Sequence, residues 1–217
     1  QRGVEDMAEK SVILSAEEEA RLLKPIDEYV GKIQAQIDEL RVDGSDKVRS
    51  LKNHIAIAKE DKNLSKEEKD SIIAKDKAAL EKAKAVEAAN KDKVAKLIAD
   101  AEGYLKEHYD SEYYSKVVAS CETEKAAENE SYERVKATLK TEHEQTLAKL
   151  SDPEEIKDEK YVYKNKLFDA QMTHESRLQE IKDRKHDAFS HKYHLIDLLR
   201  MSKYTFMQSR AQKFENY

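Results

Sequence analysis

Apolar residues recur along this chain at alternating intervals of four and three positions. The first such run comprises Ile26, Val30, Ile33, Ile37 and Leu40. This spacing places the side chains on one stripe of an α-helix, as in helices that pair lengthwise in a coiled coil. Turn-forming residues at 43–45 interrupt the stripe, which then resumes. The pattern predicts a first helix over about 15–62 with a kink at 43–45.

A second helix is predicted to begin after the turn that contains Ser65. Ser65 and Glu68 have the spacing of a capping box, in which each side chain binds the backbone amide of the other residue. Apolar and small residues then keep the same spacing without a proline. We therefore expect a helix over 66–150, although Gly103 and the residues at 110–111 are points where it could fold back.

The residues around Pro153 form the clearest local signal. Asp152 stands at an N-cap position, Pro153 at the first helical position and Glu155 at the third. One apolar stripe then runs to about residue 206, which predicts a third helix over 153–214. Because two tight turns reverse the chain twice, consecutive helices should be antiparallel.

Together these elements predict an all-α fold, an elongated antiparallel coiled coil of three long helices that forms a single domain over 1–217. A fold-back of the second helix near 103–111 would give a four-helix bundle instead. The composition agrees with helices, because 39% of the residues are charged and the chain has only 4 Gly and 2 Pro, which disfavours turn-rich β-architectures.

The charge pattern limits the kinds of partner. The net charge is −5, and a general nucleic-acid binder would need a basic surface for phosphate contacts. Basic residues concentrate near the C-terminus, since residues 160–217 carry 12 Lys and Arg against 7 Asp and Glu, whereas residues 1–159 carry 28 against 38. Nucleic acid is therefore not an expected partner.

The expected location is the cytoplasm. The single cysteine, Cys121, cannot form an intramolecular disulfide. No stretch reaches the roughly 20 apolar residues that span a bilayer, and no signal-peptide pattern opens the sequence. The cytoplasmic side of a membrane and a Gram-positive cell surface are the alternatives.

Motifs for catalysis and for metal binding are incomplete. His143-Glu144 and His174-Glu175 each begin the zinc-protease pattern HExxH, but leucine stands where the second histidine is needed. Asp187, His191 and His194 share one face of the third helix, yet one helix rarely completes a metal site. The sequence therefore predicts no enzyme activity, cofactor, metal or small-molecule substrate.

Tyrosines are frequent for a protein of paired helices. The main group comprises Tyr104, Tyr109, Tyr113 and Tyr114, and Tyr161 and Tyr163 lie beyond the second turn. These rings would either fill a wide core where three helices overlap or dock a partner through their amphipathic side chains. The expected overlap of three helices favours core filling.

The third helix has more apolar side chains over 195–207 than one seam can bury. The excess must cover another helix, a subunit or a lipid surface. Arg210 and Lys213 follow, which would suit a position beside the cytoplasmic face of a membrane. The candidate partner-binding residues are Ile196, Leu198, Met201 and Phe206.

Two function hypotheses remain. The main one is a non-catalytic structural module, a helical coiled-coil spacer or scaffold that mediates protein–protein assembly or self-association. The alternative is a membrane-associated helical module, either a soluble coiled-coil extension of a larger membrane protein or a BAR-like membrane-binding dimer. The net acidity counts against a BAR-like dimer, which needs dense basic patches.

Overall fold

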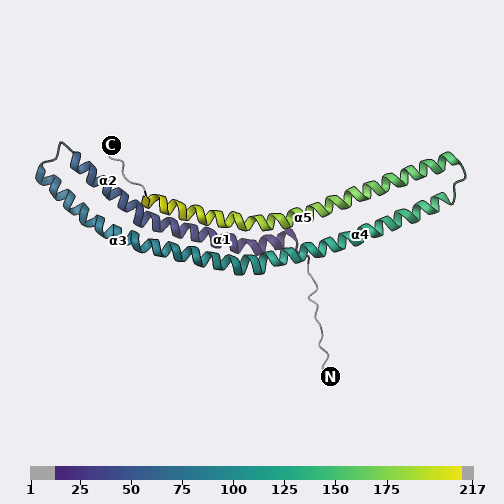
Figure 1. Cartoon of the computed structure of the whole chain (residues 1–217), viewed down its shortest axis with the longest axis horizontal. Coiled ribbons are helices and arrows are strands. Elements are labelled where there is room, and N and C mark those ends of the chain that lie inside the picture. The colour runs from purple at the N-terminus through teal and green to yellow at the C-terminus, as the bar shows by residue number, and fades with distance from the viewer. Residues whose placement is uncertain (1–12, 212–217) are drawn as a thin grey trace, which may run out of the picture. The chain divides into compact units, whose positions relative to one another are not determined.

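The computed structural model describes residues 13–211, with side chains described as far as residue 208. Every element in that part is a helix, so the all-α prediction is confirmed. The predicted helix end at 214, Lys213 and the Arg210 side chain lie outside it. In chain order the helices are α1 Ala16–Arg41, η1 Val42–Asp46, α2 Lys47–Glu60, α3 Lys66–Tyr104, η2 Leu105–Tyr114, α4 Ser115–Leu147 and α5 Pro153–Ala211 (Figure 1).

Two segments of the described helical backbone, η1 and η2, are π-helices, in which each turn is wider than in an α-helix. η1, of five residues, lies where the sequence predicts a kink at 43–45. η2, of ten residues, lies in the region where a fold-back was the alternative. The backbone stays helical through η2 instead of reversing. The four-helix alternative, which needs a reversal near 103–111, is therefore wrong.

The contacts divide the chain into two compact units. Among the described residues, unit 1 consists of the segment up to Ala20 with Glu112–Ser190, and unit 2 consists of Arg21–Ser111 with the segment from His191 onwards. Each unit combines two segments that are far apart in the sequence but pack against each other. The prediction of a single domain over 1–217 stays a prediction.

Unit 2 contains most of the core. In it, most of α1 and then α2 lie along α3, and the C-terminal part of α5 lies beside α1 (Figure 1). Its buried apolar side chains occupy the predicted stripe positions, except in η2, where Leu105 and Tyr109 are buried although the predicted stripe passed through Tyr104. They include Ile26, Val30, Ile33, Ile37, Val48, Ile55, Val94, Leu105, Tyr109, Leu195, Leu199 and Phe206.

The turn between α2 and α3 has the capping box that the sequence predicts. The Ser65 hydroxyl accepts a hydrogen bond from the Glu68 amide at 3.1 Å, and the Ser65 amide donates one to the Glu68 carboxylate at 2.8 Å. These bonds satisfy two amides that a helix start leaves without partners. They fix the point at which the chain reverses.

Unit 1 is an antiparallel hairpin of α4 and the N-terminal part of α5, with the start of α1 packed on it (Figure 1). Asp152 caps α5, because its carboxylate accepts a hydrogen bond from the Glu154 amide at 2.9 Å. The Leu14 amide donates a hydrogen bond to the Ser120 hydroxyl at 2.8 Å. This bond attaches the segment before α1 to α4.

Burial within unit 1 changes sharply along the hairpin. Val117, Ser120, Cys121 and Ala188 are buried near the start of α1. From residue 122 to residue 187, by contrast, no side chain is buried, and the seam between α4 and α5 is only half-buried. Two helices alone cannot enclose a seam, because each leaves part of the other's stripe open to water.

Candidate partner-binding surfaces

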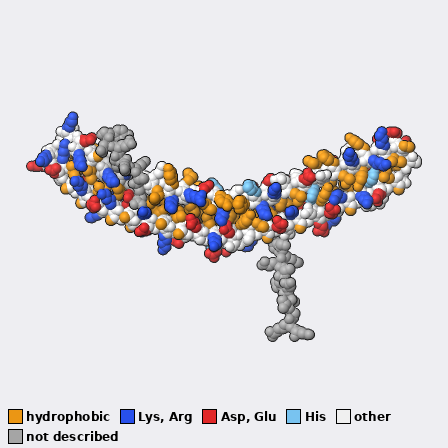
Figure 2. Space-filling model, viewed as in Figure 1, with side chains coloured by type: hydrophobic (Ala, Val, Ile, Leu, Met, Phe, Trp, Pro, Cys, Tyr) orange, Lys and Arg blue, Asp and Glu red, His pale blue; other side chains and the backbone are white. Residues whose placement is uncertain are grey.

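The C-terminal part of α5 carries large exposed apolar side chains in unit 2. Tyr193, Met201 and Tyr204 are 52%, 66% and 63% exposed. Figure 2 shows hydrophobic side chains along the surface that α5 forms, with charged side chains between them. Isolated exposed apolar residues are ordinary, but a row of them on one helix favours an interaction surface.

The four candidate residues differ in their environment. Met201 is exposed, Ile196 and Leu198 are half-buried, and Phe206 is only 1% exposed. Phe206 follows the buried Leu199 by two helical turns and so shares its stripe, whereas Met201 is rotated about 200° away from Leu199. Phe206 is therefore a core residue of unit 2, and Met201 is the most accessible of the four.

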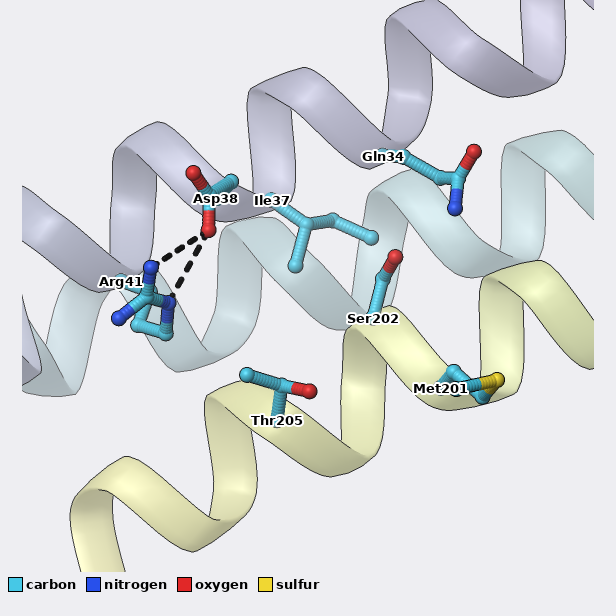
Figure 3. A pocket seen from close by; sticks show the side chains of 7 residues that line it. All are labelled: Gln34, Ile37, Asp38, Arg41, Met201, Ser202 and Thr205. Atoms are coloured by element: carbon cyan, nitrogen blue, oxygen red, sulfur yellow. Dashed lines mark hydrogen bonds and ion pairs between the residues drawn. The ribbon is translucent and has the colours of Figure 1, made fainter.

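A small depression of about 150 Å³ lies beside Met201, between α1 and α5 (Figure 3). Ile37 contributes apolar surface, and Arg41 donates hydrogen bonds to Asp38 at 2.7 and 3.1 Å. The hydroxyl groups of Ser202 and Thr205 line the α5 side. Ligand pockets usually exceed about 300 Å³. This depression suits one inserted side chain of a protein partner.

The three candidate metal ligands on α5 do not form a site in the described residues. The His191 ring pairs with the Asp27 carboxylate of α1 at 2.8 Å. The rings of His191 and His194 have centroids 5.8 Å apart. No group of three or more His, Cys, Asp or Glu in the described part of the chain is arranged to hold a metal ion.

The tyrosines divide between core and surface. Tyr109 and Tyr113 are buried, at 1% and 5% exposure. Tyr104 stacks on Tyr29 of α1, with ring centroids 3.7 Å apart. Tyr161, by contrast, is 67% exposed on α5. Core filling therefore accounts for Tyr109 and Tyr113 but not for Tyr161.

An ion-pair cluster holds the start of α1 against the hairpin. Arg184 of α5 donates a hydrogen bond to the Glu124 carboxylate of α4 at 2.6 Å and lies 3.1 Å from the Glu19 carboxylate of α1. Burial raises the pKa of Glu19, Arg184 opposes that rise, and Glu124 adds to it. Burial also raises the pKa of the Cys121 thiol, so this cysteine has the character of an inert structural residue.

The hairpin contains an internal repeat. His143-Glu144 and His174-Glu175, which each begin the pattern HExxH, are part of it, but the incomplete pattern alone does not reveal the repeat. Each arm carries glutamate, tyrosine, histidine and leucine at the same spacing, E-x3-Y-x10-H-E-x2-L. The residues are Glu128, Tyr132, His143, Glu144 and Leu147 in α4 and Glu159, Tyr163, His174, Glu175 and Leu178 in α5. Comparing the chain with itself at an offset of 31 residues finds this repeat.

The two copies of the repeat contact each other reciprocally. The His143 ring lies 2.9 Å from the Glu159 carboxylate and stacks on Tyr163. The His174 ring lies 3.2 Å from the Glu128 carboxylate and stacks on Tyr132. The hairpin therefore has approximate two-fold symmetry at these positions.

Comparisons with known proteins give one informative result. No curated protein and no solved structure matches this chain. Among the described residues, no helix is long and apolar enough to cross a bilayer. A family model described as the N-terminal domain of the ABC transporter permease MglC matches residues 16–217. Because this match covers nearly the whole chain, the chain belongs to the family of N-terminal domains of the ABC transporter permease MglC.

Proposed function

We propose that this chain is a non-catalytic helical extension of an ABC transporter permease, located on the cytoplasmic side of the membrane. The observation that carries the proposal is the family match over residues 16–217. A permease is a component of a membrane complex, so its domains work near a bilayer and near other transporter subunits. The family thus favours the membrane-associated alternative over a free-standing scaffold.

The charged side chains on the surface support a domain that is surrounded by water and not by lipid. Lys24 and Glu28 of α1 face solvent, and so do Arg134 and Glu130 of α4. Charged side chains of both signs are spread over the visible surface, among hydrophobic ones (Figure 2). Long helices that pair through a narrow seam expose most of their residues, which suits a coiled-coil spacer between binding partners.

The C-terminal part of α5 is the proposed partner-binding surface. Met201 supplies exposed apolar area, Ile196 and Leu198 border it, and the depression beside Ser202 offers a place for one inserted side chain. Methionine and tyrosine are enriched in the contact regions of protein interfaces. The proposed partner is another protein of the transporter.

The location is tested by labelling a cysteine placed at Ile57, which is 58% exposed on α2 and lies outside the proposed partner surface. Ile57→Cys in the complete permease, in the presence of the buried native Cys121, would be treated with a maleimide that cannot cross membranes. The proposal predicts labelling in inside-out membrane vesicles and none in intact cells. Labelling in intact cells would place this domain on the other side of the membrane.

The partner surface is tested by comparing two substitutions. Met201→Asp should leave the melting temperature of the isolated chain unchanged, since the site is exposed, and should reduce co-purification of the other transporter subunits. Phe206→Asp should unfold unit 2, because an unpaired buried carboxylate costs several kcal/mol. Full retention of the subunits by a stably folded Met201→Asp permease would contradict the proposed surface.

A further inference from the structure

The internal repeat allows each exposed position of α5 to be compared with the equivalent position of α4. Tyr161, Phe168 and Met172 are 67%, 60% and 49% exposed on α5. The equivalent positions of α4, 31 residues earlier, are Glu130, Ala137 and Thr141, which are also exposed. Since both sets of positions face solvent and α4 carries a charged, a small and a polar residue at its set, the hairpin itself does not require large apolar residues there.

These three residues form what we term the outer row. They are spaced by seven and four positions, so they share one stripe of α5, as in helices that pair lengthwise. They point away from the seam with α4, because Leu167 and Ala170 occupy the half-buried seam positions beside them. Lys160 and Lys164 flank the outer row and make no ion pair among the described residues of unit 1.

Unit 1 also has an unfilled groove between α4 and α5. Three adjoining depressions form it, and they share residues such as Val135 and Glu128. Its walls include Val135 and Leu139 of α4 and Ala170 of α5. The groove begins at Ile13, next to the place where the start of α1 packs on the hairpin. The start of α1 therefore lies where the groove continues along the hairpin.

The charges along the groove complement those of the outer row. The lining arginines are engaged, since Arg134 pairs with Glu130 and Arg177 with Glu128. The lining carboxylates of Glu142, Asp169 and Glu180 have no ion-pair partner in the described part of unit 1. An apolar helix flanked by lysines would meet unpaired carboxylates at the rim, and opposite charges across an interface favour the matching partner.

We infer that the occupant of this groove is a second copy of the chain, which inserts the outer row of its α5. The insertion would cover Tyr161, Phe168 and Met172 of one copy and the half-exposed seam of the other. It would also bring Lys160 and Lys164 to the rim of the groove, where Asp169 is the carboxylate that the test below uses. The inference stands apart from the proposed function, because it concerns unit 1 and not the C-terminal part of α5.

Cysteine pairs between copies test the contact directly. Two single variants, Val135→Cys in the groove and Phe168→Cys in the outer row, would be mixed and oxidised, with the buried Cys121 left in place. A disulfide-linked dimer of the two variants is expected. The matched control mixes Val135→Cys with Ala137→Cys, since Ala137 is the α4 equivalent of Phe168, and should give little product. Equal yields in both mixtures would overturn the inference.

Exchange of the outer row for its α4 equivalents tests the energetics. The triple variant Tyr161→Glu, Phe168→Ala and Met172→Thr should lose self-association in sedimentation equilibrium while its helix content and melting temperature stay unchanged. Lys164→Glu should weaken self-association, and Asp169→Lys added to it should restore part of the loss. Docking of a second copy would be refuted if the wild-type chain stayed monomeric at every concentration. The same holds if the chain stayed monomeric and its groove bound another protein.

Discussion

Two glycines of unit 2 occupy helical backbone in opposite surroundings. Gly31 has open space around the position of a Cβ atom, whereas a Cβ at Gly44 would lie 3.2 Å from the Glu87 Cα atom and 3.0 Å from the Asn90 amide nitrogen. Asn90 is buried and donates a hydrogen bond to the Leu40 carbonyl at 2.9 Å. Gly44 thus permits η1 to approach α3 closely.

This contrast predicts opposite effects of alanine. Gly31→Ala should raise the free energy of unfolding by about 1 kcal/mol, because alanine favours helix over glycine. Gly44→Ala should lower it by about 1 kcal/mol or more, because the crowding of Glu87 and Asn90 outweighs the gain in helix propensity. Urea unfolding followed by circular dichroism measures both. A stabilising Gly44→Ala would mean that η1 and α3 are not tightly packed.

The buried carboxylate of Glu19 predicts a pH effect. Its pKa is raised, mainly by burial, so folding disfavours the ionised form relative to the unfolded chain. The stability from this group is fully present below the pKa of the unfolded chain and is lost as the pH rises through the folded pKa. Glu19→Gln stays neutral and should avoid that loss.

The test compares Glu19→Gln with the wild type across pH. The variant should gain melting temperature relative to the wild type as the pH rises from about 4 to about 7. Glu17→Gln, on the exposed face of α1, is the matched control and should show no such trend. A relative gain for Glu19→Gln that shrinks with rising pH would show that Arg184 stabilises the ionised carboxylate more than burial disfavours it.

At the scale of helices, caps and turns follow from local sequence. The capping box at Ser65 and the cap at Asp152 need only residues within one turn, so their sequence signatures suffice. The turn residues at 43–45 marked the position of η1, but no local pattern reveals the tertiary contact beside it, in which Asn90 of α3 donates a hydrogen bond to the Leu40 carbonyl. The 3-4 spacing placed Phe206 on one stripe with Leu199 and left Met201 off it, yet the excess of apolar residues over 195–207 made both of them candidates for a partner surface.

The N-cap of α5 gives a prediction at this scale. Asp152→Ala should lower the free energy of unfolding of the hairpin by about 1 kcal/mol, because the Glu154 amide loses its acceptor. Ser151→Ala, one residue earlier, should change it by less than about 0.5 kcal/mol, as is usual for an exposed surface site. Thermal melts of both variants provide the measurement. Equal effects would show that Asp152 does not act as a cap.

At the scale of the whole molecule, this member of a family of permease domains carries exposed apolar side chains on α5. The sequence predicted an all-α chain, and an extension of a larger membrane protein was one of the two function hypotheses. It could not identify the permease family, because paired helices constrain the residue type at seam positions but leave the exposed faces free. The 31-residue repeat was visible in the sequence, but only the reciprocal contacts of His143 and His174 give it structural meaning.

The central claim is that a transporter subunit covers the C-terminal part of α5. The most direct measurement compares thiol labelling rates of Met201→Cys in the isolated chain and in the assembled transporter, with Ile57→Cys, which is 58% exposed on α2, as the control. The account predicts that assembly slows labelling at Met201→Cys several-fold and leaves the rate at Ile57→Cys unchanged. Equal rates at Met201→Cys in both states would contradict it.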